Sequence, residues 1–449
     1  MAVADPRPTP TIAAYRARIG ERIPLSFSQY RVWQLQQLYR DNVMYNLPRA
    51  FHVRGPLDPE AVRAALLALA LRHEPLRTRI ASDPDGFPFQ RIEREPVLDF
   101  GSVDLTGQAP AVADRLLKEA VVAPFDLGRG TLRGRCLRLG PDDWRLLFVV
   151  HHIAADDGSW RPLLSDFTAL YTAAVAGRAA SLAPLPLAYS TLARSEWQSL
   201  TEDRMAQALA YWREFFAADP GSEAGPVDGE HGSVHYQTLP QSIAAATVAG
   251  CKAAASRQGG SLFTLVLAAI AKLVGQLYSE PRPLVCLATG NRQTAEVQPL
   301  VGCFFTNLIV RLEGGPERDL AALLGRARAA IARAREAQHL AFELFARDLD
   351  LAATGQRRPP YRVYVSYRNS DMVTELALPG AHVEPVRVGT GRNTREDLVF
   401  DLWERGPQAE AGLDLDWLWR EDRFVPQTIE DAASRLRSLL DGFADPRPR

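Results

Sequence analysis

The stretch that decides the fold is "LLFVVHHIAADDGSW", residues 146–160. Its uninterrupted apolar run is typical of a β-strand covered on both faces. The run ends in two adjacent histidines, and because neighbouring strand residues point to opposite sides, His151 and His152 face different surroundings. A neutral imidazole at a strand end is a natural general base or hydrogen-bond acceptor, since its unperturbed pKa is about 6.5. Asp156 lies just past the strand, where its carboxylate either orients an imidazole or pairs with an arginine.

Other interpretations of the same cluster are less well supported. A lone histidine beside a strand end is more often structural, and that interpretation stays open for either ring. A metal site is disfavoured because adjacent strand histidines diverge and no third soft ligand has suitable spacing. The chain has no G-x-S-x-G elbow of a serine hydrolase, no Walker loop, and no G-x-G-x-x-G after a strand.

The length, composition and net charge of the chain indicate an ordinary globular protein. The chain has 449 residues, 47% of them hydrophobic, and a net charge of −1, so no basic excess points to nucleic acid or an anionic membrane. The four cysteines lack metal-ligand spacing and are expected as buried thiols in a reducing cytosol. We find no signal peptide pattern, and the longest apolar run is broken by Lys272, so the sequence predicts a cytoplasmic protein.

Outward from this stretch, each half of the chain mixes amphipathic helices with several strands. A helix is predicted from Asp58, a plausible N-cap with Pro59 at the first helical position, to about residue 74. The Pro-spaced segment "RAASLAPLPLAYS", residues 178–190, is the best domain boundary, and the Gly-rich residues 219–235 are predicted as a surface loop. We therefore expect an α/β fold of two sandwiches: a lead (1–22), a first lobe (23–180) and a second lobe (181–449).

At this point the residues resemble a known family. "HHIAADD" (151–157) resembles the HHxxxDG signature of condensation domains from nonribosomal peptide synthetases, in the chloramphenicol acetyltransferase-like superfamily. "SFSQYRVW" (26–33) is similar to the family's S-x-A-Q-x-R-x-W, and "RHEPLRTRI" (72–80) to its R-H-E-x-L-R-T-x-F. "LVGCFFTNLIVR" (300–311) is similar to its I-G-x-F-V-N-T. The order and spacing fit from about residue 22 to 445.

The resemblance implies a fold and a site. Two acetyltransferase-like lobes would form a V-shaped pseudo-dimer around a central tunnel, and donor and acceptor carrier proteins would insert phosphopantetheine arms. His152 would be the active histidine and His151 mainly structural. Asp156 would bind an arginine and hold the loop, while Gly302 and Asn307 would shape the second-lobe wall. Arg133 and Arg135 are our own candidates for the arginine that Asp156 binds. The implied reaction is acyl transfer from a carrier thioester to an amine or hydroxyl. No metal or cofactor would be bound by the chain, and a monomer is expected.

The main departure from the signature lies at its last position. Asp157 replaces the glycine, and Gly158 follows one place later. Asp157 resembles the acidic residue of a condensation-like recruitment domain, which is inactive and docks a haem monooxygenase, so that non-catalytic function is the alternative. His152 is retained here, which favours activity. Since no adenylation domain or carrier serine motif accompanies the lobes, we expect a free-standing enzyme or an excised domain.

Overall fold

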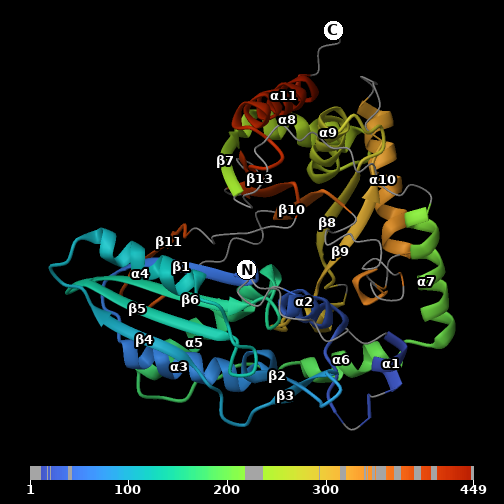
Figure 1. Cartoon of the computed structure of the whole chain (residues 1–449). Helices are drawn as coiled ribbons and strands as arrows, with labels where there is room; N and C mark the ends of the chain where they lie inside the picture. The colour runs from blue at the N-terminus through green and yellow to red at the C-terminus, as the bar shows by residue number, and fades with distance from the viewer. Residues whose placement is uncertain are drawn as a thin grey trace.

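The computed structural model describes most of both lobes. The described residues are 12–17, 19–20, 22–38, 43–217, 236–292, 294–313, 320–337, 340, 342–345, 349, 361–368, 376–388, 396–405 and 412–445. The predicted surface loop at 219–235 lies outside them. Figure 1 shows two sheet-containing lobes that meet at an angle, which confirms the predicted α/β fold of two lobes.

The first lobe is built on a five-stranded sheet of order β11-β1-β6-β5-β4. Its strands are β1 (Asn46–Arg54), β4 (Asp99–Asp104), β5 (Leu132–Gly140), β6 (Asp143–His151) and β11 (His382–Val386). β6 lies in the middle, antiparallel to β1 and β5. A separate hairpin joins β2 (Thr78–Ser82) to β3 (Pro88–Ile92), next to the short η1 (Glu74–Arg77).

Helices cover both faces of this sheet, as the unbroken apolar run of β6 predicts. Leu146 and Phe148 pack into the core formed with α3 (Pro59–Arg72) and α5 (Trp160–Val175). Leu147 and Val149 face the other way, toward α4 (Pro110–Val122). Figure 1 shows α4 above the sheet and α3 and α5 below it. The predicted start of α3 is confirmed, because the Asp58 side chain accepts hydrogen bonds from two backbone amides of its first turn.

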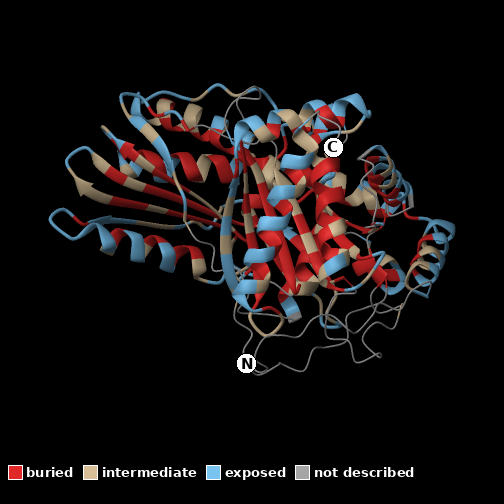
Figure 2. Cartoon of the chain, turned by 90° about the horizontal axis from the view of Figure 1, so that it is seen from above, coloured by how far each residue is buried: buried red, intermediate tan, exposed pale blue. Residues whose placement is uncertain are grey.

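The second lobe contains a six-stranded sheet of order β7-β13-β12-β10-β8-β9. Its strands are β7 (Tyr236–Ile243), β8 (Leu284–Gly290), β9 (Phe305–Arg311), β10 (Val363–Arg368), β12 (Leu398–Arg405) and β13 (Gly412–Arg420). The helices of this lobe are α8 (Ala245–Arg257), α9 (Leu262–Leu277), α10 (Leu320–Ala337) and α11 (Pro426–Ala444). In Figure 2 the buried residues gather in the strands and on the inner sides of the helices.

The lobes are connected by more than the chain that runs between them. α1 (Ile12–Ala17), α2 (Phe27–Leu38), α6 (Tyr189–Gln198) and α7 (Glu202–Ala217) lie along the junction in Figure 1. β11 comes late in the chain but pairs with β1 in the first lobe, from Ala50↔Val386 to Arg54↔His382. A division of the chain at residue 180 therefore omits a strand that the second half contributes to the first sheet.

Two findings bear on membranes and metals. Among the described residues no single helix is long and apolar enough to cross a membrane, and only α8 and α9 together, bent by 99°, meet the length and composition criteria. Within the same residues, no group of three or more His, Cys, Asp or Glu side chains is arranged to hold a metal ion. All four cysteines are buried and free of disulfides, as expected.

Candidate active site

The two histidines diverge at the end of β6. The strand ends at His151, which pairs with Asn46 of β1, and the His152 amide then donates to the Tyr45 carbonyl at 2.7 Å. Ala154 N closes the following turn by donating to the His151 carbonyl. The prediction that the two rings face different surroundings is confirmed, because His151 is buried in the first lobe whereas His152 lines a cavity.

His151 has the environment of a structural residue. Its side chain is fully buried beside the rings of Phe125 and Tyr45, and its Nδ1 accepts a hydrogen bond from the Ile153 amide at 3.2 Å. Burial, and to a smaller extent the neighbouring His152, lowers the pKa of His151 to about 3. A neutral ring with this contact supports the turn that carries His152.

The His152 ring is held in one tautomer. Its Nδ1 lies 2.8 Å from the Ala155 carbonyl oxygen, which can only accept, so Nδ1 carries the proton. Burial lowers the pKa of His152 to about 4, although the carboxylates of Asp157 and Asp156 act in the opposite direction. Near neutral pH the ring is therefore uncharged, and the lone pair of Nε2 is left for a group in the cavity.

Phe305, the first residue of β9, supports that ring from the second lobe. The His152 and Phe305 ring centroids lie 3.8 Å apart, and the Arg31 guanidinium carbon lies 4.1 Å from the same Phe305 centroid. Two planar groups so close to one centroid cannot share a face, so Phe305 is sandwiched between them. The stack separates the His152 imidazole from the Arg31 cation.

Asp156 anchors the loop to the second lobe, as the resemblance implied, but through a different arginine. Its Oδ1 accepts from Arg292 Nη2 at 2.7 Å and from the Ser159 amide and hydroxyl, and its Oδ2 accepts from the Phe304 amide. Asp156 also caps η2 (Asp157–Ser159) in a reciprocal bond with Ser159.

The proposed partners Arg133 and Arg135 were wrong. Both bind Asp99 at the edge of the first sheet, at 2.6 and 2.7 Å. They lie on β5, next to β6, but their side chains extend toward Asp99 on β4. Arg292 follows β8 by two residues, far along the chain, and no local pattern marks it as a partner of Asp156.

Two glycines allow close packing at this point. A Cβ on Gly158 would lie 2.7 Å from Arg292 Nε, and a Cβ on Gly302 would lie 2.3 Å from the Tyr189 ring. Contrary to the prediction, Gly302 does not line the cavity. Its backbone amide and carbonyl form hydrogen bonds with the Ser159 hydroxyl instead. Asn307 does line the cavity and donates from Nδ2 to Glu343 at 3.0 Å.

Asp157 lies between two arginines. Its Oδ2 is 2.8 Å from Arg368 Nε, and its Oδ1 is 3.4 Å from Arg49 Nη2. Burial alone would raise its pKa, but Arg368 and Arg49 outweigh burial and lower the pKa of Asp157 well below its usual range. The carboxylate stays ionised, and arginines balance its charge beside His152.

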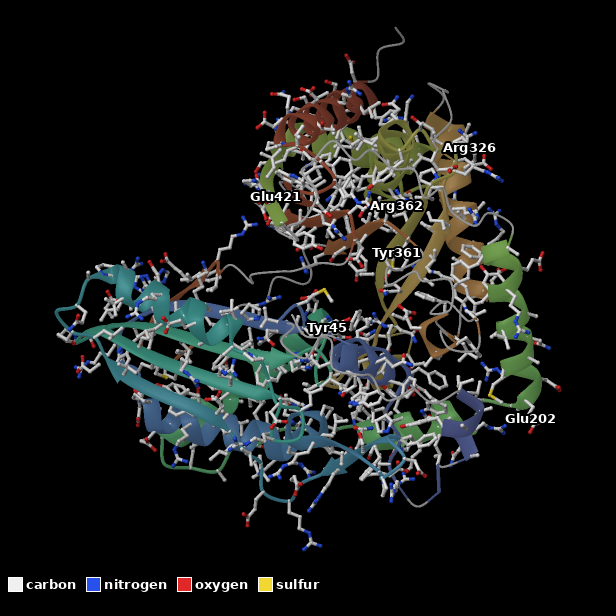
Figure 3. All side chains as sticks on the ribbon, viewed as in Figure 1. Tyr45, Glu202, Arg326, Tyr361, Arg362 and Glu421 are labelled. Carbon is white, nitrogen blue, oxygen red and sulfur yellow. The ribbon has the colours of Figure 1, made fainter. Side chains whose placement is uncertain are left out.

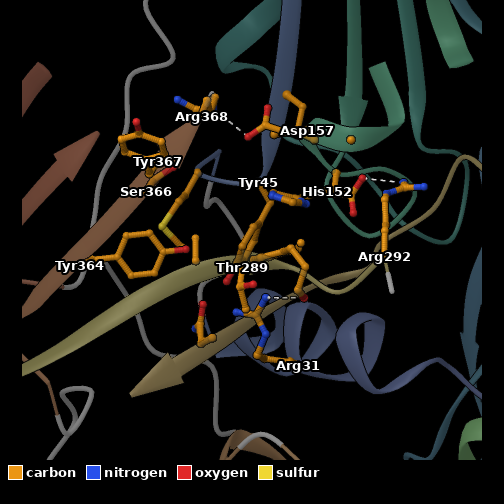
Figure 4. A pocket seen from close by; sticks show the side chains of 18 of the residues that line it. Arg31, Tyr45, His152, Asp157, Thr289, Arg292, Tyr364, Ser366, Tyr367 and Arg368 are labelled. Carbon is orange, nitrogen blue, oxygen red and sulfur yellow. Dashed lines mark hydrogen bonds and ion pairs between the residues drawn. The ribbon is translucent and has the colours of Figure 1, made fainter. Parts of the chain in front are cut away.

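The cavity between the lobes has a volume of about 490 Å³. Figure 4 shows His152 and Asp157 on one side and residues of β8 and β10, including Thr289, Tyr364, Ser366 and Arg368, on the other. Tyr45 of the first lobe and Tyr361 of the second lie at this junction (Figure 3). The sequence patterns missed the lining residues Arg31, Tyr45, Phe305, Tyr361, Tyr364 and Arg368. Arg31 and Phe305 do lie inside the motifs at 26–33 and 300–311, which was the signal available for them.

Comparison with protein families gives a match over nearly the whole chain. The model described as "Condensation domain" matches residues 19–446. A linear gramicidin synthase of Brevibacillus parabrevis is 32% identical over 94% of this chain, and the isonitrile lipopeptide synthase of Mycobacterium tuberculosis is 32% identical over 97%. The aligned region spans only 6% and 18% of those two synthases.

Solved structures include similar folds from related assembly lines. The X-domain from teicoplanin biosynthesis has a TM-score of 0.82 and 27% identity, with 96% of each chain covered. The same domain in complex with OxyB has a TM-score of 0.79 and 25% identity, over 99% of this chain and 96% of that one. The first condensation domain of the calcium-dependent antibiotic synthetase has a TM-score of 0.74 at 20% identity, over 96% of this chain and 98% of that one, which shows the shared fold.

Proposed function

This chain belongs to the condensation domain family of nonribosomal peptide biosynthesis, and from that premise we propose that it transfers an acyl or peptidyl group from a carrier-protein thioester to an acceptor amine or hydroxyl. The family generally forms amide or ester bonds. The observation that carries the proposal is His152, whose Nδ1–H is committed to Ala155 and whose Nε2 lone pair is free for the cavity between the lobes.

The reaction moves one proton and exchanges one bond. The acceptor nitrogen or oxygen attacks the thioester carbonyl, the new C–N or C–O bond forms, and the C–S bond breaks to release the pantetheine thiol. His152 Nε2 would accept the proton from the attacking group and return it to the leaving thiolate. Because the ring lies against Phe305 and is bonded to Ala155, it needs no rearrangement to do so.

The importance of that proton transfer depends on the acceptor. An α-amine has a pKa near 8, so roughly a tenth is already neutral at pH 7, and positioning would supply much of the rate. A hydroxyl remains protonated at any physiological pH, so its attack depends more strongly on a base. No covalent intermediate with the chain is needed, and both substrates would arrive on phosphopantetheine arms of carrier proteins.

Recruitment of a haem monooxygenase is the second candidate function. It is favoured by the likeness to the teicoplanin X-domain and its complex with OxyB, and by the acidic residue at position 157. The retained His152, with its free Nε2, favours transfer. The two functions require different outcomes, so one pair of assays separates them.

The test uses donor carriers loaded with a panel of acyl groups, amine and hydroxyl acceptors, and intact-protein mass spectrometry. We expect the acceptor mass to rise by the mass of the donor acyl group, at a rate above that of the carriers alone. In parallel, immobilised chain is exposed to a haem monooxygenase from a peptide assembly line. Tight binding of that protein, with no transfer across the panel, would instead establish the recruitment function.

A further inference from the structure

Four charged side chains form a continuous row between the two lobes. Arg49 on β1 and Asp157 in η2 belong to the first lobe, and Arg368 at the end of β10 and Asp401 on β12 belong to the second. The links measure 3.4 Å (Arg49–Asp157), 2.8 Å (Asp157–Arg368) and 2.7 Å (Arg368–Asp401). The signs alternate, so each inner residue has an opposite charge on both sides.

The middle link of this row spans the cavity. Asp157 and Arg368 both line it, together with His152, and Figure 4 shows Arg368 extending from β10 to Asp157. A substrate that passes between β10 and the loop after β6 must therefore pass the ion pair. The pair also connects η2 of the first lobe directly to β10 in the sheet of the second lobe.

The row of four charges differs from the Asp156–Arg292 pair in whether opening leaves a charge without a partner. If the Asp157–Arg368 link breaks, Asp157 keeps Arg49 and Arg368 keeps Asp401, so neither charge is stranded. The side chains of Asp157 and Arg368 are 25% and 21% exposed, whereas those of Asp156 and Arg292 are only 4% and 8% exposed. Partly exposed ion pairs contribute little net stability, while stranding a buried charge is strongly destabilising. The Asp157–Arg368 pair can therefore open reversibly, and the Asp156–Arg292 pair serves as a permanent anchor.

We propose that the Asp157–Arg368 ion pair is an interlobe clasp: it holds the lobes together across the cavity and opens when a carrier-delivered substrate passes on that side of His152. This inference rests on the proposed transfer function for its substrate, but the clasp itself is a property of the fold. The clasp assigns a partner, Arg368, and a function to Asp157, which replaces the glycine of the signature. Arg368 is then a positioning residue that acts through Asp157.

The direct test measures the distance between the lobes without any substrate. Spin labels are placed at Lys118→Cys on α4 and Arg435→Cys on α11, both exposed, in a chain whose native cysteines are all buried. We expect Asp157→Asn and Arg368→Gln each to lengthen or broaden the distance distribution, and the double variant to show no further change. Arg54→Gln, which breaks an exposed ion pair with Glu384 within the first-lobe sheet, is the matched control and is expected to have no effect.

Transfer gives a second readout. Asp157→Gly keeps Asp156, Gly158 and Arg292 in place, and we expect about a two- to tenfold faster transfer from loaded carriers, the scale of one partly exposed ion pair. An unchanged interlobe distance in both single variants, additive effects in the double variant, or slower transfer in a folded Asp157→Gly chain would each overturn the clasp. Absence of transfer in every chain would count against the proposed function, and the distance measurement would still decide on the clasp.

Discussion

Arg292→Met is expected to destabilise the protein by about 3–5 kcal/mol and to slow transfer by about 100-fold per folded molecule. The substitution leaves the Asp156 carboxylate, which is 4% exposed, without its cation. It also removes two bonds from Arg292 Nη1 to the carbonyls of Val297 and Leu300, which hold the loop between β8 and β9. Because that loop leads to Phe305, the support of His152 would shift with it.

The measurement combines denaturant unfolding with transfer rates at a temperature where every variant is folded. Arg133→Met is the matched control, since Arg133 is also a buried arginine paired with an aspartate, Asp99, but away from the cavity. It should lower stability and leave the transfer rate unchanged. Arg292→Lys should recover part of the stability, because it keeps the charge and loses the fork of donors. A wild-type transfer rate in folded Arg292→Met would show that the anchor does not position His152.

His152→Ala is expected to reduce transfer to a hydroxyl acceptor by about 10²–10⁴-fold, the usual contribution of a general base. For an amine acceptor the part that comes from forming the neutral amine is at most about tenfold at pH 7. The variant should fold, since the ring is only half-buried and gives up one hydrogen bond and two aromatic contacts, with Phe305 and Tyr45. The ratio of the two losses, measured with matched acceptors, therefore reports on proton transfer.

His52→Ala is the control for histidine replacement. His52 lies on β1 and its ring contacts Asp143. Asp143 pairs with Arg54, at the opposite end of the β1–β6 pairing from His151. The His52→Ala variant should leave both rates unchanged. Equal losses for the amine and hydroxyl acceptors in His152→Ala would show that the ring positions the acceptor and moves no proton.

The local features of the site were predictable because they depend on short-range rules. An apolar run covered on both faces and a period of two along the strand are both properties of residues 146–160. They correctly separated His151 from His152, whereas the pairing of Asp156 with an arginine was implied only by the family resemblance. The two-lobed fold followed from the resemblance and from the mixture of helices and strands in each half.

The contacts between the lobes were not predictable in this way. Arg292, Phe305 and Arg368 meet the histidine loop from more than 130 residues further along the chain, and no pattern in one sequence relates them to it. For the same reason Arg133 and Arg135, which are near in sequence, were chosen wrongly. β11 belongs to the first sheet but follows β7, β8, β9 and β10 of the second sheet in the chain. A single division point along the sequence therefore cannot assign β11 to the first lobe.

The central claim is that His152 presents a free Nε2 lone pair to the cavity at neutral pH. The most direct measurement is ¹⁵N NMR of the histidine-labelled chain, with His152→Gln to identify the signal among eight histidines. Since burial lowers the pKa to about 4, the ring should stay neutral, with the proton on Nδ1, as pH falls from 8 to about 5, and charge only near pH 4. A charged ring at pH 7, or a proton on Nε2, would contradict the account.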